Sequence, residues 1–125
     1  MPKTRDQWMA ETVYHKLEPL QANEAEAKKY GSLAHKLPVL IKTAGLAQAL
    51  AFVEARGGEE GKTLLTHIAQ VVNQKDVDTL QKAVRTAELQ AYIRLTQEIL
   101  AALVWFKRFA QSVLKVDPTN DGGIK

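Results

Sequence analysis

The segment from Leu80 to Val116 most constrains the fold, because it contains neither proline nor glycine and its apolar residues recur at helical spacing. At about 100° per residue, one broad face collects Leu89, Tyr92, Ile93, Ile99, Leu100, Leu103, Phe106, Ala110, Val113 and Leu114. This pattern predicts a long C-terminal helix with at most one break near Thr86, ended by Pro118. No segment alternates apolar and polar residues over the length of a strand, so the chain is predicted to be all-α.

Capping signals divide the rest of the chain into shorter helices. Thr4 and Gln7 have the spacing of a capping box, and Pro19 is expected to kink or end the helix that they begin. Asn23 and Glu26 repeat that spacing and predict the start of a second helix.

The segment from 35 to 52 has one continuous apolar face but carries two helix breakers, Pro38 and Gly45. Pro38 is predicted to be an early residue of a new helix, where a missing N–H costs nothing. Gly45 is predicted to be a C-terminal cap in a left-handed conformation, with the next helix running from Leu46 to Arg56.

Two glycines, Gly57 and Gly58, then end that helix, and residues 59–72 are predicted to form the next one. Asp76 or Asp78 is expected to cap the helix that follows. The signals together predict a single compact bundle of about five or six helices over residues 1–116, with 117–125 as a flexible C-terminal tail.

The composition is that of a globular protein of one domain, with 125 residues, 46% hydrophobic and 25% charged. No apolar run approaches the ~18 residues of a membrane-spanning helix, so no membrane partner is expected. The absence of cysteine suits a reducing cytoplasm, and cytoplasmic localisation is the expectation. A net charge of +3 is weak evidence for an anionic partner, so the distribution of charge matters more.

Motifs that carry catalytic chemistry fail on inspection. The stretch RGGEEGKT resembles a phosphate-binding loop, but only three residues separate Gly57 from Gly61, and a helix precedes it instead of a strand. The three histidines lie too far apart for a local metal signature, and paired carboxylates occur only at helix starts. The sequence therefore predicts no enzyme, no catalytic residue, no metal and no cofactor.

Positive charge gathers without acids between Lys28 and Gly45. The four lysines of this window are candidates for contacts with RNA phosphates: Lys28, Lys29, Lys36 and Lys42. No acidic residue follows any of them by one helical turn, and this absence predicts uncompensated positive potential along the window. The alternative is an ordinary solvated helix face.

The polar face of the C-terminal helix adds two more candidates for RNA contact, Arg94 and Arg108. Trp105 lies on this same face, and together with Lys115 it is a candidate for a protein interface. The alternative for Trp105 is that another helix or the tail of the chain covers it.

The sequence resembles a known family at two motifs that occur in a fixed order. The first comprises Tyr30, then Leu37-Pro38-x-Leu40-Ile41 and Gly45-Leu46-x-Gln48-x-Leu50-Ala51-Phe52. The second comprises Glu98-x-Leu100 and Trp105-Phe106-Lys107-Arg108-Phe109-Ala110. This combination is similar to the small helical subunit of the type III-B Cmr CRISPR effector, which targets RNA, and the likeness covers roughly Glu24 to Val116.

The resemblance implies a non-catalytic subunit whose copies stack into a short filament inside the effector. It implies partners among the other Cmr subunits, copies of the chain itself, and the guide RNA–target RNA duplex whose channel the filament lines. Acids in the middle of the chain suggest that one side faces RNA. From the residues alone, a helical protein–protein adaptor with an incidental basic face stays open as the alternative.

Overall fold

A computed structural model of the chain describes residues 3–118, all of whose regular elements are helices. They are α1 (Arg5–Leu17), the short 3₁₀ helix η1 (Glu18–Ala22), α2 (Glu24–Ala44), α3 (Leu46–Arg56), α4 (Gly58–Val71), α5 (Val77–Thr86) and α6 (Leu89–Ser112). The all-α bundle with a long last helix is confirmed. Most of the predicted tail, residues 119–125, lies outside the described residues, and the division into one domain and a tail stays a prediction.

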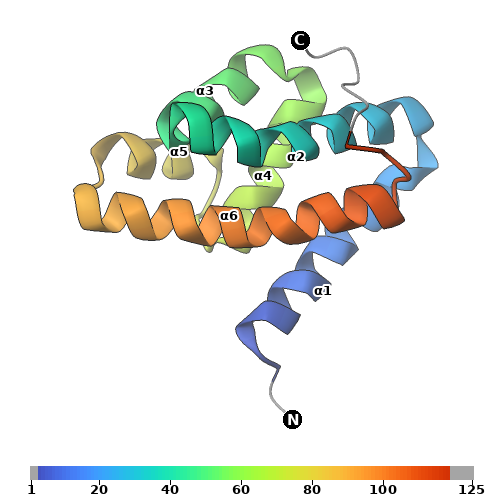
Figure 1. Cartoon of the computed structure of the whole chain (residues 1–125), viewed down its shortest axis with the longest axis horizontal. Coiled ribbons are helices and arrows are strands. Elements are labelled where there is room, and N and C mark those ends of the chain that lie inside the picture. Colours follow the sequence, from blue (N-terminus) through green and yellow to red (C-terminus); the bar gives the residue numbers. More distant parts are fainter. Residues whose placement is uncertain (1–2, 119–125) are drawn as a thin grey trace.

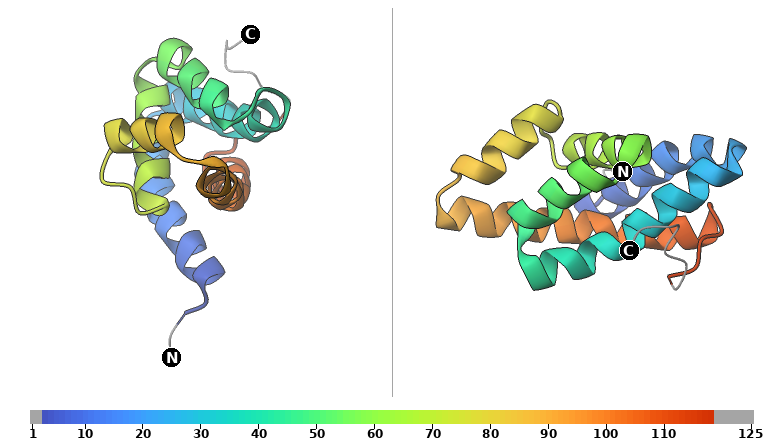
Figure 2. Two further views of the ribbon diagram at one scale, coloured as in Figure 1. Left: turned by 90° about the vertical axis from the view of Figure 1, so that its left-hand side faces the viewer. Right: turned by 90° about the horizontal axis from the view of Figure 1, so that it is seen from above.

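Helices α2 and α6 form the centre of the molecule and pack more extensively than any other pair (Figure 1). They run in opposite directions (Figure 1). Tyr92, in the first turn of α6, accepts a hydrogen bond at its hydroxyl from the amide of Ala47, which lies just after the end of α2. Helix α1 packs on α6 and projects away from the pair, while α3 and α4 pack on α2, and α5 packs on α3 and α4 (Figure 2).

The core forms where the apolar stripes of these helices meet, which is the main driving force for folding. Tyr30 of α2 and Phe106 of α6 are the largest side chains that are fully buried. Around them lie Val13, Leu17, Leu33, Leu37, Leu46, Leu50, Leu64, Leu65, Ile68, Leu80, Ile99 and Leu103.

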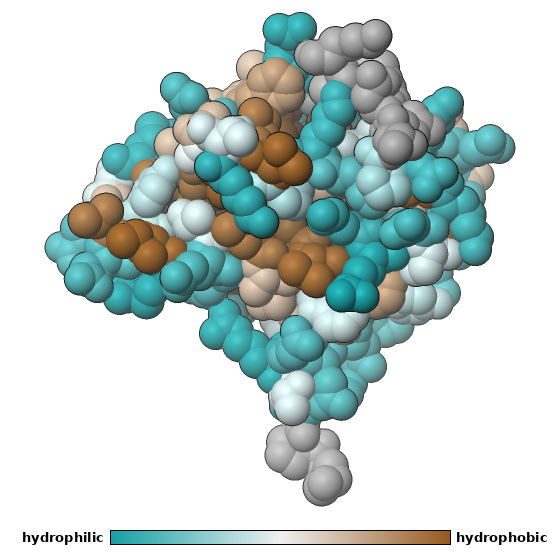
Figure 3. Space-filling model, in the orientation of Figure 1, coloured by the Kyte–Doolittle hydropathy of each residue, from teal (hydrophilic) through white to brown (hydrophobic). Residues whose placement is uncertain are grey.

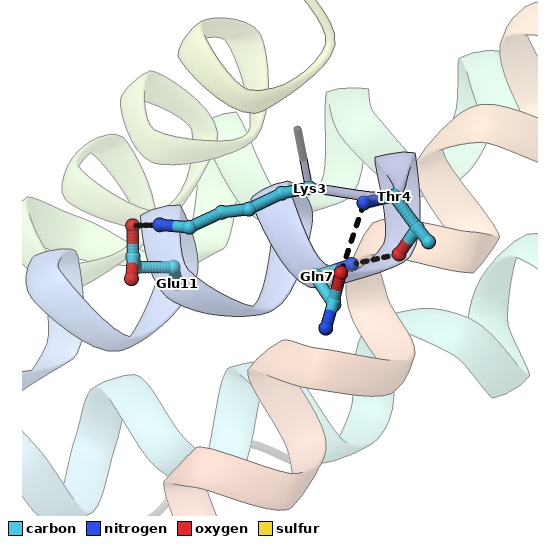
Figure 4. Close-up of polar contacts among 4 residues, drawn as sticks. All are labelled: Lys3, Thr4, Gln7 and Glu11. Atoms are coloured by element: carbon cyan, nitrogen blue, oxygen red, sulfur yellow. Dashed lines mark hydrogen bonds and ion pairs between the residues drawn. The ribbon is translucent and has the colours of Figure 1, made fainter. Parts of the chain in front are cut away.

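The predicted caps are present in the structure. Thr4 and Gln7 form a capping box, with Thr4 Oγ1 accepting from the Gln7 amide at 3.0 Å (Figure 4). Asn23 Oδ1 accepts from an α2 amide in the same way. For α5 the cap is Asp76 and not Asp78, because Asp76 Oδ1 accepts from the Thr79 amide at 2.8 Å.

The prediction that Pro38 begins a new helix is wrong. Helix α2 continues through Pro38 to Ala44, and Pro38 is buried between Leu37 and Ile41 in the same apolar stripe. A proline inside a helix costs about 3 kcal/mol, and burial of apolar side chains on both sides of it offsets this cost.

Gly45 caps α2 and also precedes α3, as predicted, but its conformation differs from the expected one. Its φ of 89° and ψ of 160° lie in a region that only glycine occupies readily, whereas the left-handed helical region has ψ near about 47°. The connection between α2 and α3 therefore depends on a backbone conformation that favours glycine.

The break expected near Thr86 is confirmed at Ala87 and Glu88, and it separates α5 from α6. Helix α6 ends at Ser112, four residues before the predicted end. Lys115 then takes a positive φ of 61° and reverses the chain, so that the amide of Val116 donates to the carbonyl of Ala110 at 2.9 Å. This reversal returns the last described residues to the surface of α2.

Candidate nucleic-acid interface

The four lysines of α2 form two rows, not one face. Lys29 and Lys36 are seven residues apart, and Lys28 and Lys42 are fourteen apart, so each pair lies on one side of the helix. Lys28 and Lys42 are exposed, whereas Lys29 and Lys36 are half-buried.

Tertiary packing gives Lys29 an acidic partner. Lys29 Nζ lies 3.8 Å from Glu60 Oε1 of α4. The expectation that all four lysines are uncompensated is therefore wrong for Lys29. Spacing along one helix could not show this, because Glu60 comes from a different helix.

Lys28 and Lys115 come together at the end of the bundle. Both line a hollow of about 550 Å³ between the first turns of α2 and the segment that follows α6. Glu24 also lines this hollow, so the local charge is mixed. A candidate for RNA contact and a candidate for a protein interface thus share one surface.

Arg94 lies apart from the α2 lysines, on the side of α6 that faces α1. It lines a hollow of about 360 Å³ together with Arg5 and Glu98. The Nη2 of Arg5 contacts Glu98 Oε2 at 2.7 Å, which ties α1 to α6 across this hollow.

Helix α1 covers part of Trp105, in agreement with the alternative that another helix lies over this side chain. Its Nε1 donates to Asp6 Oδ1 at 3.0 Å, and its ring stacks on Phe109 with centroids 5.8 Å apart. The side chain stays half-exposed, and the Cζ atom of Arg108 lies 5.8 Å from the centre of its ring. This is cation–π geometry, so Arg108 is held beside Trp105 on the surface.

One hollow beside Arg108 was missed from the sequence. It is lined by His35 of α2, by Pro118, and by a row of α6 residues that comprises Val104, Lys107, Arg108 and Gln111. The signal was present in the spacing of that row, since positions i, i+3, i+4 and i+7 share one side of a helix. Lys107 is half-buried in this row, between the core and the surface.

Comparison with known proteins now gives the family. Residues 5–113 match the family described as "CRISPR-associated protein (Cas_Cmr5)". The chain is 47% identical over 113 residues to the "CRISPR system Cmr subunit Cmr5" of Thermus thermophilus, covering 90% of this chain and 98% of that protein. This chain belongs to the Cmr5 family. The resemblance to the Cmr small-subunit family that the sequence motifs carried is confirmed.

A solved structure supports the same relationship at the level of the fold. The crystal structure of a CRISPR-associated Cmr5 family protein from Thermus thermophilus matches with a TM-score of 0.83 and 47% identity. The match covers 90% of this chain and 98% of that one. At this identity and coverage the whole bundle, and not one motif, is the Cmr5 fold.

The Cmr5-like motifs are mostly core positions in this structure. Leu37, Leu46, Leu50, Phe106 and Ala110 are all buried. The buried motif positions therefore specify how the helices pack, whereas Trp105, Lys107 and Arg108 of the second motif reach the surface.

One buried polar pair of this Cmr5 protein joins two helices. The Tyr30 hydroxyl lies 2.7 Å from His67 Nδ1, between α2 and α4. Burial, with the nearby Lys16 ammonium, lowers the pKa of His67 to about 4, so its ring is neutral at pH 7 while it shares this hydrogen bond with the hydroxyl. Burial also raises the pKa of Tyr30. The pair joins two helices through one hydrogen bond, which is a structural role.

Within residues 3–118, no three His, Cys, Asp or Glu side chains are placed to hold a metal ion. None of the helices in this range is long and apolar enough to cross a membrane.

Proposed function

We propose that this chain is the non-catalytic small subunit of a Cmr CRISPR effector complex, which acts in antiviral defence. In this proposal it packs against other Cmr subunits and copies of itself, and its basic side chains lie along the guide RNA–target RNA duplex. The observation that carries the proposal is the 47% identity to the Cmr5 subunit of Thermus thermophilus over nearly the whole of that protein.

Exposed apolar side chains support contacts with protein neighbours. Val39, Leu89, Ile93 and Val104 are each at least 45% exposed. In the space-filling view, apolar areas extend over the face formed by α2 and α6, between hydrophilic side chains (Figure 3). Apolar surface of this kind marks interaction sites, and polar surroundings keep it soluble until a partner covers it.

The chemistry of the basic residues supports contact with phosphates and not with bases. Lysine acts as a point charge on a phosphate, whereas base readout usually needs Asn, Gln or forked Arg pairs in a groove. The candidates lie on several sides of α2 and α6 and do not converge on one point. Such an arrangement suits a strand that passes along the surface without being read.

Reconstitution tests the assembly. The other Cmr subunits are co-expressed with a guide RNA, with and without this chain, and purified complexes are compared by native mass spectrometry and by cleavage of a matching target RNA. We expect this chain to join the complex in more than one copy, and to degrade no labelled RNA when purified alone. A chain that stays out of the complex, or cleaves RNA by itself, would refute the proposal.

Charge neutralisation tests which row of α2 lysines contacts RNA. We expect Lys28→Gln/Lys42→Gln to weaken binding of unrelated single-stranded RNAs equally, because both side chains are exposed. Each lost phosphate contact should flatten the slope of log affinity against log salt by about 0.7. Lys29→Gln/Lys36→Gln should have a smaller effect, since Lys29 already pairs with Glu60.

A matched control removes the same charge elsewhere. Lys75→Gln/Lys82→Gln changes two exposed lysines near α5. If this control weakens RNA binding as much as the α2 variants do, the α2 lysines are solvated surface and the adaptor alternative gains support.

A further inference from the structure

The hollow beside Arg108 has the properties of an anion site built from three different segments. It encloses about 330 Å³ between the C-terminal half of α6, the middle of α2 and the chain at Pro118. Lys107, Arg108 and Gln111 line it from two successive turns of α6. All three side chains offer N–H donors, and no acidic residue lines the hollow within residues 3–118.

The two cations of this hollow have no ion pair with an acid elsewhere in residues 3–118. Lys107 is half-buried, so its side chain loses part of its hydration. No carboxylate of the described residues pairs with it to offset this loss. Arg108 has one face of its guanidinium group near the Trp105 ring, 5.8 Å from Cζ to the ring centre. That contact fixes the group in place and leaves the N–H donors at its edge for an oxygen ligand.

His35 builds the wall of the hollow. Its Nε2 lies 2.9 Å from the carbonyl oxygen of Val116, and only an N–H can donate there, so Nε2 carries the ring proton. The side chain of Val116 fits against Gly31, where an added Cβ would lie 2.6 Å from Val116 Cγ2. These two contacts fasten the segment after α6 onto α2 and set the position of Pro118.

The other ring nitrogen of His35 is an unmet acceptor. Nδ1 is buried and has no hydrogen-bond partner among the described residues, while His35 as a whole is only 6% exposed. Buried polar atoms of this kind are uncommon in folded proteins.

We propose that this hollow binds one phosphodiester group of an RNA strand. Lys107 and Arg108 contact the phosphate oxygens and the Gln111 amide donates to the same group, while Val104 and Pro118 form an apolar wall against the adjoining ribose. His35 is a positioning residue that holds this wall. The inference rests on the proposed RNA contact, and it adds a specific site to the exposed lysines of α2.

The deciding measurement is fluorescence anisotropy of a labelled, unstructured uridine oligomer with the purified chain at low salt. Lys107→Gln/Arg108→Gln should lower the affinity about tenfold, whereas the control Lys75→Gln/Lys82→Gln should lower it less than twofold. The single variant Arg108→Gln changes an exposed side chain and keeps the test valid if the double variant does not fold. Equal losses for the site and control variants would overturn the inference.

The role of His35 is tested by rescue. His35→Gln keeps a donor that can reach the Val116 carbonyl, whereas His35→Leu does not. We expect His35→Leu to reduce RNA affinity and His35→Gln to restore most of it, with thermal midpoints compared for both. If both variants lose the same RNA affinity, and the loss follows the fall in their thermal midpoints, His35 only supports the fold.

Further outcomes separate this inference from the proposed function. A polyglutamate peptide that competes with the oligomer at similar concentration would identify a site for acidic protein and overturn the phosphate assignment. Absence of RNA binding by the unsubstituted chain would overturn it as well. In either case, assembly with the other Cmr subunits would show that the proposed subunit function still holds.

Discussion

The two halves of α6 rest on one core but present different residues to solvent. The N-terminal half exposes apolar side chains, with Leu89 73% and Ile93 45% exposed. The C-terminal half carries Lys107, Arg108 and Gln111, which line the hollow beside α2. The most exposed apolar side chain of α6 thus lies near its start and the cations of the hollow lie near its end, although Arg94 is exposed in the first half and Val104 in the second.

Core packing and surface chemistry are therefore set by different positions of α6, and the family motif from Trp105 to Ala110 contains positions of both kinds. Side chains that face the core fix where α6 lies, and they are apolar along its whole length. Side chains that face outward are free to differ from one turn to the next. An apolar end suits a protein neighbour, and a cationic end suits a phosphate.

The two halves of α6 should differ most in the stability lost when a buried side chain of each is truncated. Phe106 is 0% exposed and Leu95 is 8% exposed, so Phe106→Ala should leave the larger cavity. We expect Phe106→Ala to reduce the free energy of unfolding by about 3–5 kcal/mol and Leu95→Ala by about 2 kcal/mol. Urea denaturation of both variants measures this, and a reversed order would show that the N-terminal half is the better anchored.

The next effect concerns the corner that supports the N-terminal half. Gly45 has a positive φ of 89°, and a Cβ added there would lie 3.7 Å from the Tyr92 hydroxyl, so backbone strain and not a clash sets the cost. Gly45→Val should destabilise the protein by about 1–2 kcal/mol. Ala44→Val, at the exposed end of α2, is the control for adding a branched side chain. Equal thermal midpoints for the two variants would contradict a conformational role for Gly45.

The sequence predicted the helices well because their signals are local. Capping residues such as Thr4, Asn23 and Asp76 act within one turn, and the apolar stripes of α1, α2 and α5 that follow them are buried. On α6 the prediction of one apolar face was wrong at Leu89 and Ile93, which are exposed because the first turns of α6 extend past the core. Pro38 was misassigned because its local cost competes with burial along the whole of α2, and only tertiary packing decides between them.

The candidate site was harder to predict because it depends on contacts between distant segments. Lys29 meets Glu60 through packing of α4, and His35 meets Val116 through the reversal at Lys115. Neither contact has a signal at short spacing. The row of Lys107, Arg108 and Gln111 was readable on α6, but the wall opposite that row was not.

Acid should weaken the protein at a place outside both halves of α6. The pKa of His67 in the folded protein is about 4, below its ordinary value of 6.5, so between these values the unfolded chain binds a proton that the folded chain does not. Stability from this group is therefore complete above pH 6.5 and is lost as the pH falls toward 4. Because the ring keeps part of its surface in water, we expect a small decrease.

Unfolding free energies measured from about pH 7 to about pH 4 check this expectation. His67→Gln should flatten the pH dependence in that window, while His15→Gln, an exposed histidine of α1, should leave it unchanged. A wild-type curve that stays flat across the window, or falls equally in both variants, would assign the effect to other groups.

Substitutions on the surface of α6 should change stability least, but they should separate RNA binding from incorporation into the complex most clearly. Leu89→Gln/Ile93→Gln alters two exposed side chains and should change the free energy of unfolding by no more than about 0.5 kcal/mol. RNA affinity should also stay within twofold, because neither residue lines the cationic hollow. Incorporation into a reconstituted Cmr complex should fall, since an apolar contact with a protein neighbour is lost. Lys107→Gln/Arg108→Gln should give the reverse result, with normal incorporation and weaker RNA binding. If both pairs of substitutions impair the same property, the two ends of α6 form one surface with one partner.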